Sequence, residues 1–137
     1  MVLARENRRI SLMEVMQMMQ SAVREESFNS VRVFWLDYDL IWERLQDRIG
    51  LLKSHPEIRK VIIFGSFPEK RAVPGSDLDL LIIVNPTDLP ILDRIEHYQP
   101  LFEGIGIGVD IFPLTEDELH MPIAQKALSD GFLLFER

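Results

Sequence analysis

Two aspartates, Asp77 and Asp79, stand one residue apart at the start of the apolar segment that ends at Val84. Because side chains alternate along a β-strand, this spacing predicts both carboxylates on one face, with Cα atoms roughly 6.7 Å apart. Two adjacent carboxylates repel each other, and burying them without a partner is costly. A divalent cation between them removes both penalties, and oxygen ligands of this kind are typical of Mg²⁺ or Mn²⁺ sites.

A third aspartate, Asp110, lies in an alternating segment at 105–112. One face carries apolar side chains and the other carries Gly106, Gly108 and Asp110, the apolar face being formed by Ile105, Ile107, Val109 and Ile111. An isolated aspartate is disfavoured inside an apolar strand, and a local exception of this kind is typical of a functional site. The two glycines leave room for a ligand beside the carboxylate.

Gly65 and Ser66 follow the apolar segment 61–64, and two interpretations of them are open. Glycine allows close approach of the backbone, and exposed N–H groups together with a hydroxyl can hold a phosphate. Alternatively, Ser66 and Glu69 have the spacing of a capping box, in which case Ser66 caps a helix. The two roles coexist only if Glu69 points away from the phosphates.

The elements that position these residues alternate between strands and helices. Strands are predicted at 31–35, 61–64, 78–84, 105–112 and 132–135. Helices are predicted at 11–24, from a cap at Asp37 or Asp39 to about residue 52, at 87–102 and at 122–130, with a short acidic helix capped by Thr115. The connection between residues 65 and 77 is too short for a crossover helix, so its flanking strands are expected to be antiparallel. We therefore expect one α+β domain over residues 1–137, with helices packed on a small mixed sheet and residues 1–30 as an N-terminal helical extension.

The composition limits the class of protein. The chain has 137 residues, 47% hydrophobic and 27% charged, which excludes a disordered or collagen-like chain. Without cysteine it forms no disulfide or thiolate metal site, and its apolar runs are too short to span a membrane, so we expect a cytoplasmic protein. Residues 72–137 carry 12 Asp or Glu against 3 Lys or Arg, which disfavours a general nucleic-acid-binding surface. The histidines, His55, His97 and His120, lack the spacing of metal ligands and are interpreted as surface residues.

The combined pattern resembles a known superfamily. Gly65-Ser66, then Gly75-Ser76-Asp77-Leu78-Asp79, then Val109-Asp110 is similar to the signature of the DNA polymerase beta-like nucleotidyltransferases, and more narrowly of the minimal nucleotidyltransferases (MNT), over about residues 31–137. The resemblance implies a polymerase beta palm-like fold and transfer of a nucleoside monophosphate, expected to be AMP from ATP, to a hydroxyl. It also implies two Mg²⁺ ions, with Mn²⁺ as an alternative, held by Asp77, Asp79 and Asp110, which are then the expected catalytic residues.

The sequence departs from this family directly after Gly65-Ser66, where relatives usually have a small residue, Arg and Gly. Residues 68–70 are instead Pro, Glu and Lys, so that Lys70 or Arg71 would have to supply the missing positive charge. The triphosphate would lie beside Gly65-Ser66. The expected nucleotide-binding residues are Gly65, Ser66, Lys70 and Ser76.

The length leaves little room for a domain that holds the acceptor, so we expect a homo-oligomer or a partner protein to complete the site. Minimal relatives are often encoded with a helical HEPN protein, and in these toxin–antitoxin pairs the partner is adenylylated. The resemblance therefore implies an antitoxin of such an MNT/HEPN pair. The alternative is a non-catalytic binding module or antitoxin subunit that acts by protein–protein contact, which Glu69 and the methionine-rich segment within 11–24 favour.

Overall fold

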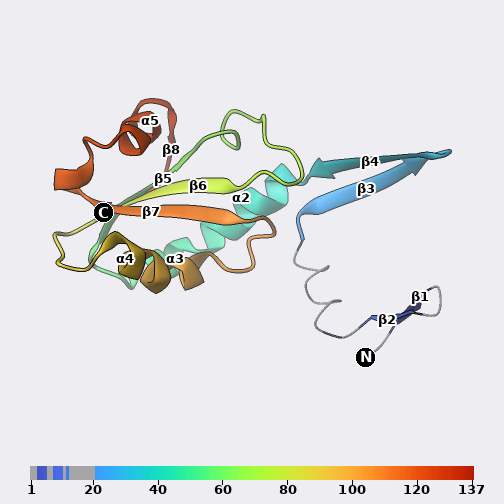
Figure 1. The fold of residues 1–137 in the computed structure, drawn as a ribbon, viewed down its shortest axis with the longest axis horizontal. Helices are drawn as coiled ribbons and strands as arrows, with labels where there is room; N and C mark the ends of the chain where they lie inside the picture. Colours follow the sequence, from blue (N-terminus) through green and yellow to red (C-terminus); the bar gives the residue numbers. More distant parts are fainter. Residues whose placement is uncertain (1–2, 6–7, 11, 13–20) are drawn as a thin grey trace.

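The computed structural model describes residues 3–5, 8–10, 12 and 21–137, and its centre is a four-stranded mixed sheet (Figure 1). The strands are β5 (Ile58–Phe64), β6 (Leu78–Val84), β7 (Val109–Thr115) and β8 (Phe132–Glu136). They lie in the order β7-β6-β5-β8, with β6 and β7 parallel and the other neighbours antiparallel. The expected α+β class is confirmed, as is the antiparallel pairing across residues 65–77.

Helices cover both faces of this sheet. The helices α2 (Tyr38–Asp47), α3 (Ile49–Lys53) and α4 (Ile91–Tyr98) pack on one face, and α5 (Pro122–Asp130) packs on the other (Figure 1). Alternate residues of β6 belong to the two cores: Leu78, Leu80, Ile82 and Val84 to the first, and Leu81 and Ile83 to the second. Because burial of apolar surface is the dominant favourable term in folding, this two-sided packing holds β6 firmly at the centre of the molecule.

Local capping and proline decide where the helices begin. Asp37 accepts a hydrogen bond from Leu40 N at 3.1 Å and caps α2, as predicted. The helix α4 begins at Ile91 and not at 87–88, because Pro90 disfavours the helical conformation in the residue before it. Two short 3-10 helices are also present: η1 (Gln99–Phe102) and η2 (Glu116–Glu118), the second capped by Thr115 as predicted. In the described part of the chain, no helix has the length and apolar character needed to cross a membrane.

Strand β7 differs from the strand predicted at 105–112, since it begins later and continues through Pro113. Proline cannot donate to a strand ladder, but β7 lies at an edge of the sheet, where no strand of the described residues pairs with its outer side. Side chains from the α4–η1 region bond to carbonyls of this edge. Gln99 Nε2 donates to Val109 O at 3.0 Å, and Arg94 Nη1 donates to Pro113 O at 3.2 Å.

A hairpin of β3 (Val23–Phe28) and β4 (Val31–Leu36) projects from the sheet and its helices (Figure 1). The strand predicted at 31–35 is confirmed, whereas the helix predicted at 11–24 is wrong at its end, because residues 23–24 pair with β4. Residues 11 and 13–20 of that helix lie outside the described residues. A second hairpin, β1 (Leu3–Arg5) with β2 (Arg8–Ile10), means that strands occupy much of the described part of 1–30, where a helical extension was predicted.

Candidate active site

The three aspartates meet at one end of the sheet, where β6 and β7 begin. Asp79 and Asp110 are partners in the register of this parallel pair, so their Cα atoms lie on strands roughly 4.8 Å apart. Asp77 precedes Asp79 by two residues and therefore faces the same side. Further along that face, Leu81 and Leu114 lie in the core beneath α5. Asp79 is half-buried, whereas Asp77 and Asp110 are exposed, so the carboxylates form the open end of this face.

Two glycines make room for these carboxylates. A Cβ placed on Gly108 would lie 2.3 Å from Asp77 Oδ1, and one on Gly65 would lie 2.4 Å from Asp79 Oδ2, both closer than real Cβ contacts come. Gly65 also has a φ of +84°, in the left-handed region that favours glycine. The room predicted beside Gly108 therefore exists, but the Asp77 carboxylate occupies part of it.

Partial burial and neighbouring charge raise the pKa values of two of these groups. Burial raises the pKa of Asp79, and the charges of Asp110 and Asp77 raise it further, whereas the ammonium of Lys126 on α5 lowers it. Burial also raises the pKa of Asp110, together with the charge of Asp77 and a hydrogen bond to it. The carboxylates thus oppose one another's ionisation, which is the electrostatic condition that a cation relieves. Three carboxylates, which are hard oxygen donors, fit Mg²⁺ or Mn²⁺.

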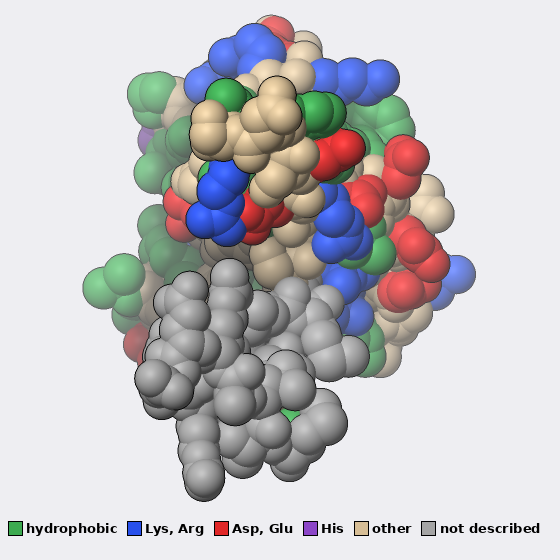
Figure 2. Space-filling model, turned by 90° about the vertical axis from the view of Figure 1, so that its right-hand side faces the viewer, with side chains coloured by type: hydrophobic (Ala, Val, Ile, Leu, Met, Phe, Trp, Pro, Cys, Tyr) green, Lys and Arg blue, Asp and Glu red, His purple; other side chains and the backbone are tan. Residues whose placement is uncertain are grey.

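Lys126 was not singled out from the sequence. Its effect on Asp79 depends on the packing of α5 across β5 and β6, which brings a residue from a distant segment to the aspartates. The surface that faces the viewer in Figure 2, at the end from which the β3–β4 hairpin projects, carries Lys and Arg side chains beside Asp and Glu side chains. Positive charge is therefore available close to acidic groups on this side of the molecule.

Residues 65–70 form a turn, and no helix begins at Ser66. The capping-box interpretation of Ser66 is therefore wrong, because the loop closes through a backbone hydrogen bond from Arg71 N to Ser66 O of 2.9 Å. Glu69 Oε2 accepts a hydrogen bond from Arg71 Nε at 2.6 Å, so its negative charge has a basic partner within the loop. Ser66 is half-buried, and Lys70 is exposed with a positive φ of 57°.

Ser76 stabilises the turn that leads into β6. Its hydroxyl accepts a hydrogen bond from Val73 N at 3.1 Å, and its own N–H donates to Val73 O at 2.9 Å. Of the four residues expected to bind nucleotide, Gly65 lies beside Asp79, whose carboxylate occupies the place of a Cβ at that position, and Ser76 directly precedes Asp77. Ser66 and Lys70 lie in the turn that follows β5.

His97 and His120 are exposed, as predicted for surface residues, but the histidines are not all dispersed. His55 and His97 lie together with Glu57, and their potential ligand atoms all come within 4.8 Å of one another. Among the described residues, no other group of three or more His, Asp or Glu side chains brings its potential ligand atoms this close together. The carboxylate oxygens of the three aspartates are therefore spread more widely. His97 is exposed, whereas His55 and Glu57 are half-buried. Because His55 and His97 are far apart in the sequence, no motif spacing reveals this cluster.

The fold is that of a nucleotidyltransferase. The crystal structure described as a putative nucleotidyltransferase from Sulfolobus solfataricus matches with a TM-score of 0.57 at 22% identity, over 73% of this chain and 84% of that chain. A mutant of the toxin–antitoxin MntA-HpeT matches with a TM-score of 0.51 at 22% identity, over 74% and 75%.

Sequence comparison identifies the family. Residues 46–137 match the family model described as "Polymerase beta, Nucleotidyltransferase". The Methanocaldococcus jannaschii protein named "Putative protein adenylyltransferase MJ1217" is 30% identical over 94 residues, which are 68% of this chain and 92% of that protein. The chain therefore belongs to the polymerase beta nucleotidyltransferase family and is a nucleotidyltransferase.

Proposed function

We propose that this nucleotidyltransferase transfers AMP from ATP to a hydroxyl group of a partner protein and that Asp77, Asp79 and Asp110 form its Mg²⁺ site. The observation that carries the proposal is the meeting of these three carboxylates on one face of β6 and β7, with Gly65 and Gly108 giving them room. When bound, Mg²⁺ acidifies an attacking hydroxyl and neutralises charge on departing pyrophosphate. The name of the M. jannaschii relative, a protein adenylyltransferase, supports AMP and a protein acceptor.

Residues of the chain itself would bind the triphosphate and accept the proton of the acceptor hydroxyl. Gly65 and Ser66, in the turn beside Asp79, would hold the triphosphate through backbone N–H groups and the hydroxyl. The oxygen of the acceptor hydroxyl then bonds to the α-phosphorus. The bond between that phosphorus and the oxygen bridging it to the β-phosphorus breaks, so pyrophosphate leaves. The hydroxyl proton passes to the carboxylate of Asp110. Positioning and charge stabilisation supply most of the rate, without a protein nucleophile.

The β3–β4 hairpin supports the protein-partner part of the proposal. It lies outside the residues that match the family model, and it exposes large apolar side chains: Phe28, Val31, Val33, Phe34 and Trp35. A two-stranded hairpin is marginally stable by itself, and an exposed apolar patch of this kind marks an interaction surface. The toxin–antitoxin MntA-HpeT neighbour supports a partner of this type, for which we propose a helical HEPN-type protein and an antitoxin role for this chain.

The proposal is tested by label transfer. The protein is incubated with Mg²⁺, with ATP labelled at the α-phosphate and with the product of the neighbouring reading frame, and the proteins are separated on a gel. Label on the partner that is lost in Asp77→Ala supports the proposal, and the same experiment with the other three NTPs tests the choice of base. Transfer that Asp77→Ala leaves unchanged would remove the proposed site.

The second candidate is an antitoxin that neutralises its partner by contact alone. The exposed apolar hairpin favours it, because that surface can bind without any chemistry. This function predicts a complex that survives Asp77→Ala and Asp79→Ala, measured by size-exclusion chromatography, without label on the partner. A complex that forms only with the aspartates intact counts against it.

Gly108→Ala is expected to leave the protein folded but to reduce AMP transfer by about 10- to 100-fold. The backbone at Gly108 is not in the left-handed region, so alanine is tolerated there, but its Cβ would displace the Asp77 carboxylate. Gly50→Ala is the matched control, because a Cβ at Gly50 meets nothing within 4 Å. Label-transfer rates and thermal unfolding of both variants check the prediction, and a fully active Gly108→Ala would contradict it.

A further inference from the structure

A second cluster of potential metal ligands lies away from the aspartates. His55 and Glu57 belong to the connection between α3 and β5, and His97 belongs to the last turn of α4. His55 Nδ1 lies 3.2 Å from Glu57 Oε1, and the ring centroids of His55 and His97 are 6.2 Å apart. One ligand atom from each of the three residues can be chosen so that all lie within 4.8 Å of one another. Three donors of this kind therefore lie close together in the folded chain.

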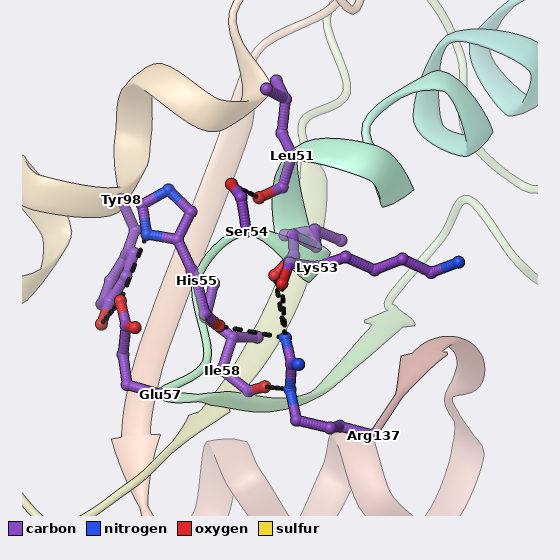
Figure 3. Close-up of polar contacts among 9 residues, drawn as sticks. Leu51, Lys53, Ser54, His55, Glu57, Ile58, Tyr98 and Arg137 are labelled. Carbon is purple, nitrogen blue, oxygen red and sulfur yellow. Dashed lines mark hydrogen bonds and ion pairs between the residues drawn. The ribbon is translucent and has the colours of Figure 1, made fainter.

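The turn that carries His55 and Glu57 is held in place by Arg137 (Figure 3). The Arg137 guanidinium donates to Ile58 O at 3.0 Å and to His55 O at 3.1 Å. It also donates to the carbonyls of Leu52 and Lys53, each at 3.2 Å. A single side chain thus ties together the end of α3 and the start of β5. The backbone that presents the two ligands is consequently pre-organised.

The carboxylate of Glu57 has an additional partner of the kind that supports metal ligands. Tyr98 donates its hydroxyl proton to Glu57 Oε1 at 3.2 Å (Figure 3). The Tyr98 ring also contacts the His97 ring, with centroids 4.7 Å apart. Hydrogen bonds to ligating carboxylates orient them toward a metal ion. Because Tyr98 is itself buried, its hydroxyl holds the Glu57 carboxylate in a defined position.

The cluster is distinct from the aspartates in both place and chemistry. Ile58 pairs with Val84 at the end of β6, whereas Asp79 lies near its beginning, so β6 separates the two groups by roughly 20 Å. Imidazole nitrogen with carboxylate oxygen is a donor set suited to Zn²⁺ and related transition metals, whereas Mg²⁺ prefers oxygen alone. His55 and Glu57 are 29% and 35% exposed, which leaves an ion a path from solvent.

We propose that His55, Glu57 and His97 bind one divalent transition-metal ion of the Zn²⁺ type. Three protein ligands leave the fourth tetrahedral position to water or to a group from outside the chain. The ion bridges the α3–β5 connection to α4, two segments that pack on the same face of the sheet. Binding therefore stabilises the folded chain, because the three ligands are gathered only in the folded state.

The test uses the full chain without a histidine tag, stripped of metal and titrated with Zn²⁺ against a chromophoric chelator. At least one ion per chain is expected, with a Kd on the order of 10 μM or lower at the site that His97→Ala removes. His97→Ala is expected to weaken binding at least about tenfold. His120→Ala is the matched control, since His120 is also exposed and lies outside the cluster. Absence of saturable binding, or equal Kd values for His97→Ala and His120→Ala, overturns the proposal.

Two further readouts locate the ion. The chain has three histidines, so the ring NMR signals of His55 and His97 are expected to shift with Zn²⁺ while those of His120 stay in place. Asp77→Asn is expected to leave Zn²⁺ affinity unchanged, because the aspartates lie at the other end of the sheet. Zn²⁺ binding that is lost in Asp77→Asn and kept in His97→Ala would place the ion at the aspartates and refute this second site.

Discussion

Asp79→Asn is expected to lower AMP transfer on the order of a thousandfold while raising the melting temperature of the metal-free protein by about 1–3 °C. The loss of activity follows from removing one charge of the proposed Mg²⁺ site. The gain in stability follows from the raised pKa of Asp79, because burial and the charges of Asp110 and Asp77 disfavour its ionised form in the folded state. Neutral asparagine avoids that cost at every pH above the usual carboxyl range.

Lower AMP transfer together with a higher melting temperature in Asp79→Asn would distinguish loss of the metal site from simple damage to the fold. Label transfer and thermal unfolding are measured with and without Mg²⁺, and Mg²⁺ is expected to stabilise the wild type more than Asp79→Asn. Asp88→Asn is the matched control, because it removes the same charge from an exposed loop position. If Asp79→Asn were both less stable and inactive, its loss of activity would say nothing about metal binding, and the electrostatic description of the site would be wrong.

Arg94→Met is expected to reduce the free energy of unfolding at pH 7 by about 2–4 kcal/mol, somewhat less than the usual cost of breaking a fully buried ion pair. The Arg94 side chain is 7% exposed and donates to Leu89 O at 2.8 Å, to Pro113 O at 3.2 Å and to Glu118 Oε1 at 2.6 Å. Methionine fills similar volume but removes the Arg94 donor from all three acceptors, so Glu118 Oε1 keeps only its hydrogen bonds from Thr115. The estimate is reduced because Glu118 is 26% exposed and can regain water.

The dependence on pH gives this prediction a second test. Arg94 and the hydrogen bonds from Thr115 outweigh burial and lower the pKa of Glu118 below its ordinary value of 4.5. A lowered carboxyl pKa adds stability above the unfolded-state value, and this stability is lost as the pH falls through the folded-state value. The difference between wild type and Arg94→Met should therefore shrink from pH 7 to pH 3 in urea titrations.

Arg32→Met provides the comparison for the buried pair. Arg32 and its partner Glu25 are 59% and 39% exposed on the β3–β4 hairpin, so breaking this pair is expected to cost at most about 1 kcal/mol. Equal losses of stability in Arg32→Met and Arg94→Met would show that burial of the Arg94 pair does not matter, contrary to the structure.

Elements with a strong local signal could be predicted from the sequence. Two local signals give β6 and α5 with the predicted bounds: the apolar run between Leu78 and Val84, and Pro122 at the first position of α5 with Gly131 after its last residue. The alternation of side chains along a strand also predicted that Asp77 and Asp79 face the same side. The shared face of Asp77 and Asp79 followed from the strand period, whereas Asp110 was assigned to the same site only by the resemblance to the family, because the register of the two strands is not written in either segment.

Features that depend on distant packing could not be predicted in this way. The His55–His97 cluster exists because α4 packs beside the connection between α3 and β5, and no spacing rule connects residues so far apart in the chain. At Ser66, a capping-box pattern was overridden by a closed turn. At residues 23–24, pairing with β4 supplied backbone hydrogen bonds that the helical pattern could not anticipate.

The most direct test of the account is a crystal structure with Mn²⁺ and a non-hydrolysable ATP analogue, in which anomalous scattering locates the metal. We expect Mn²⁺ bound by carboxylate oxygens of Asp77, Asp79 and Asp110 at about 2.1 Å, with the phosphates against Gly65 and Ser66. Mn²⁺ bound elsewhere, or an Asp110 carboxylate turned away from the ion while nucleotide is bound, would contradict the proposed active site.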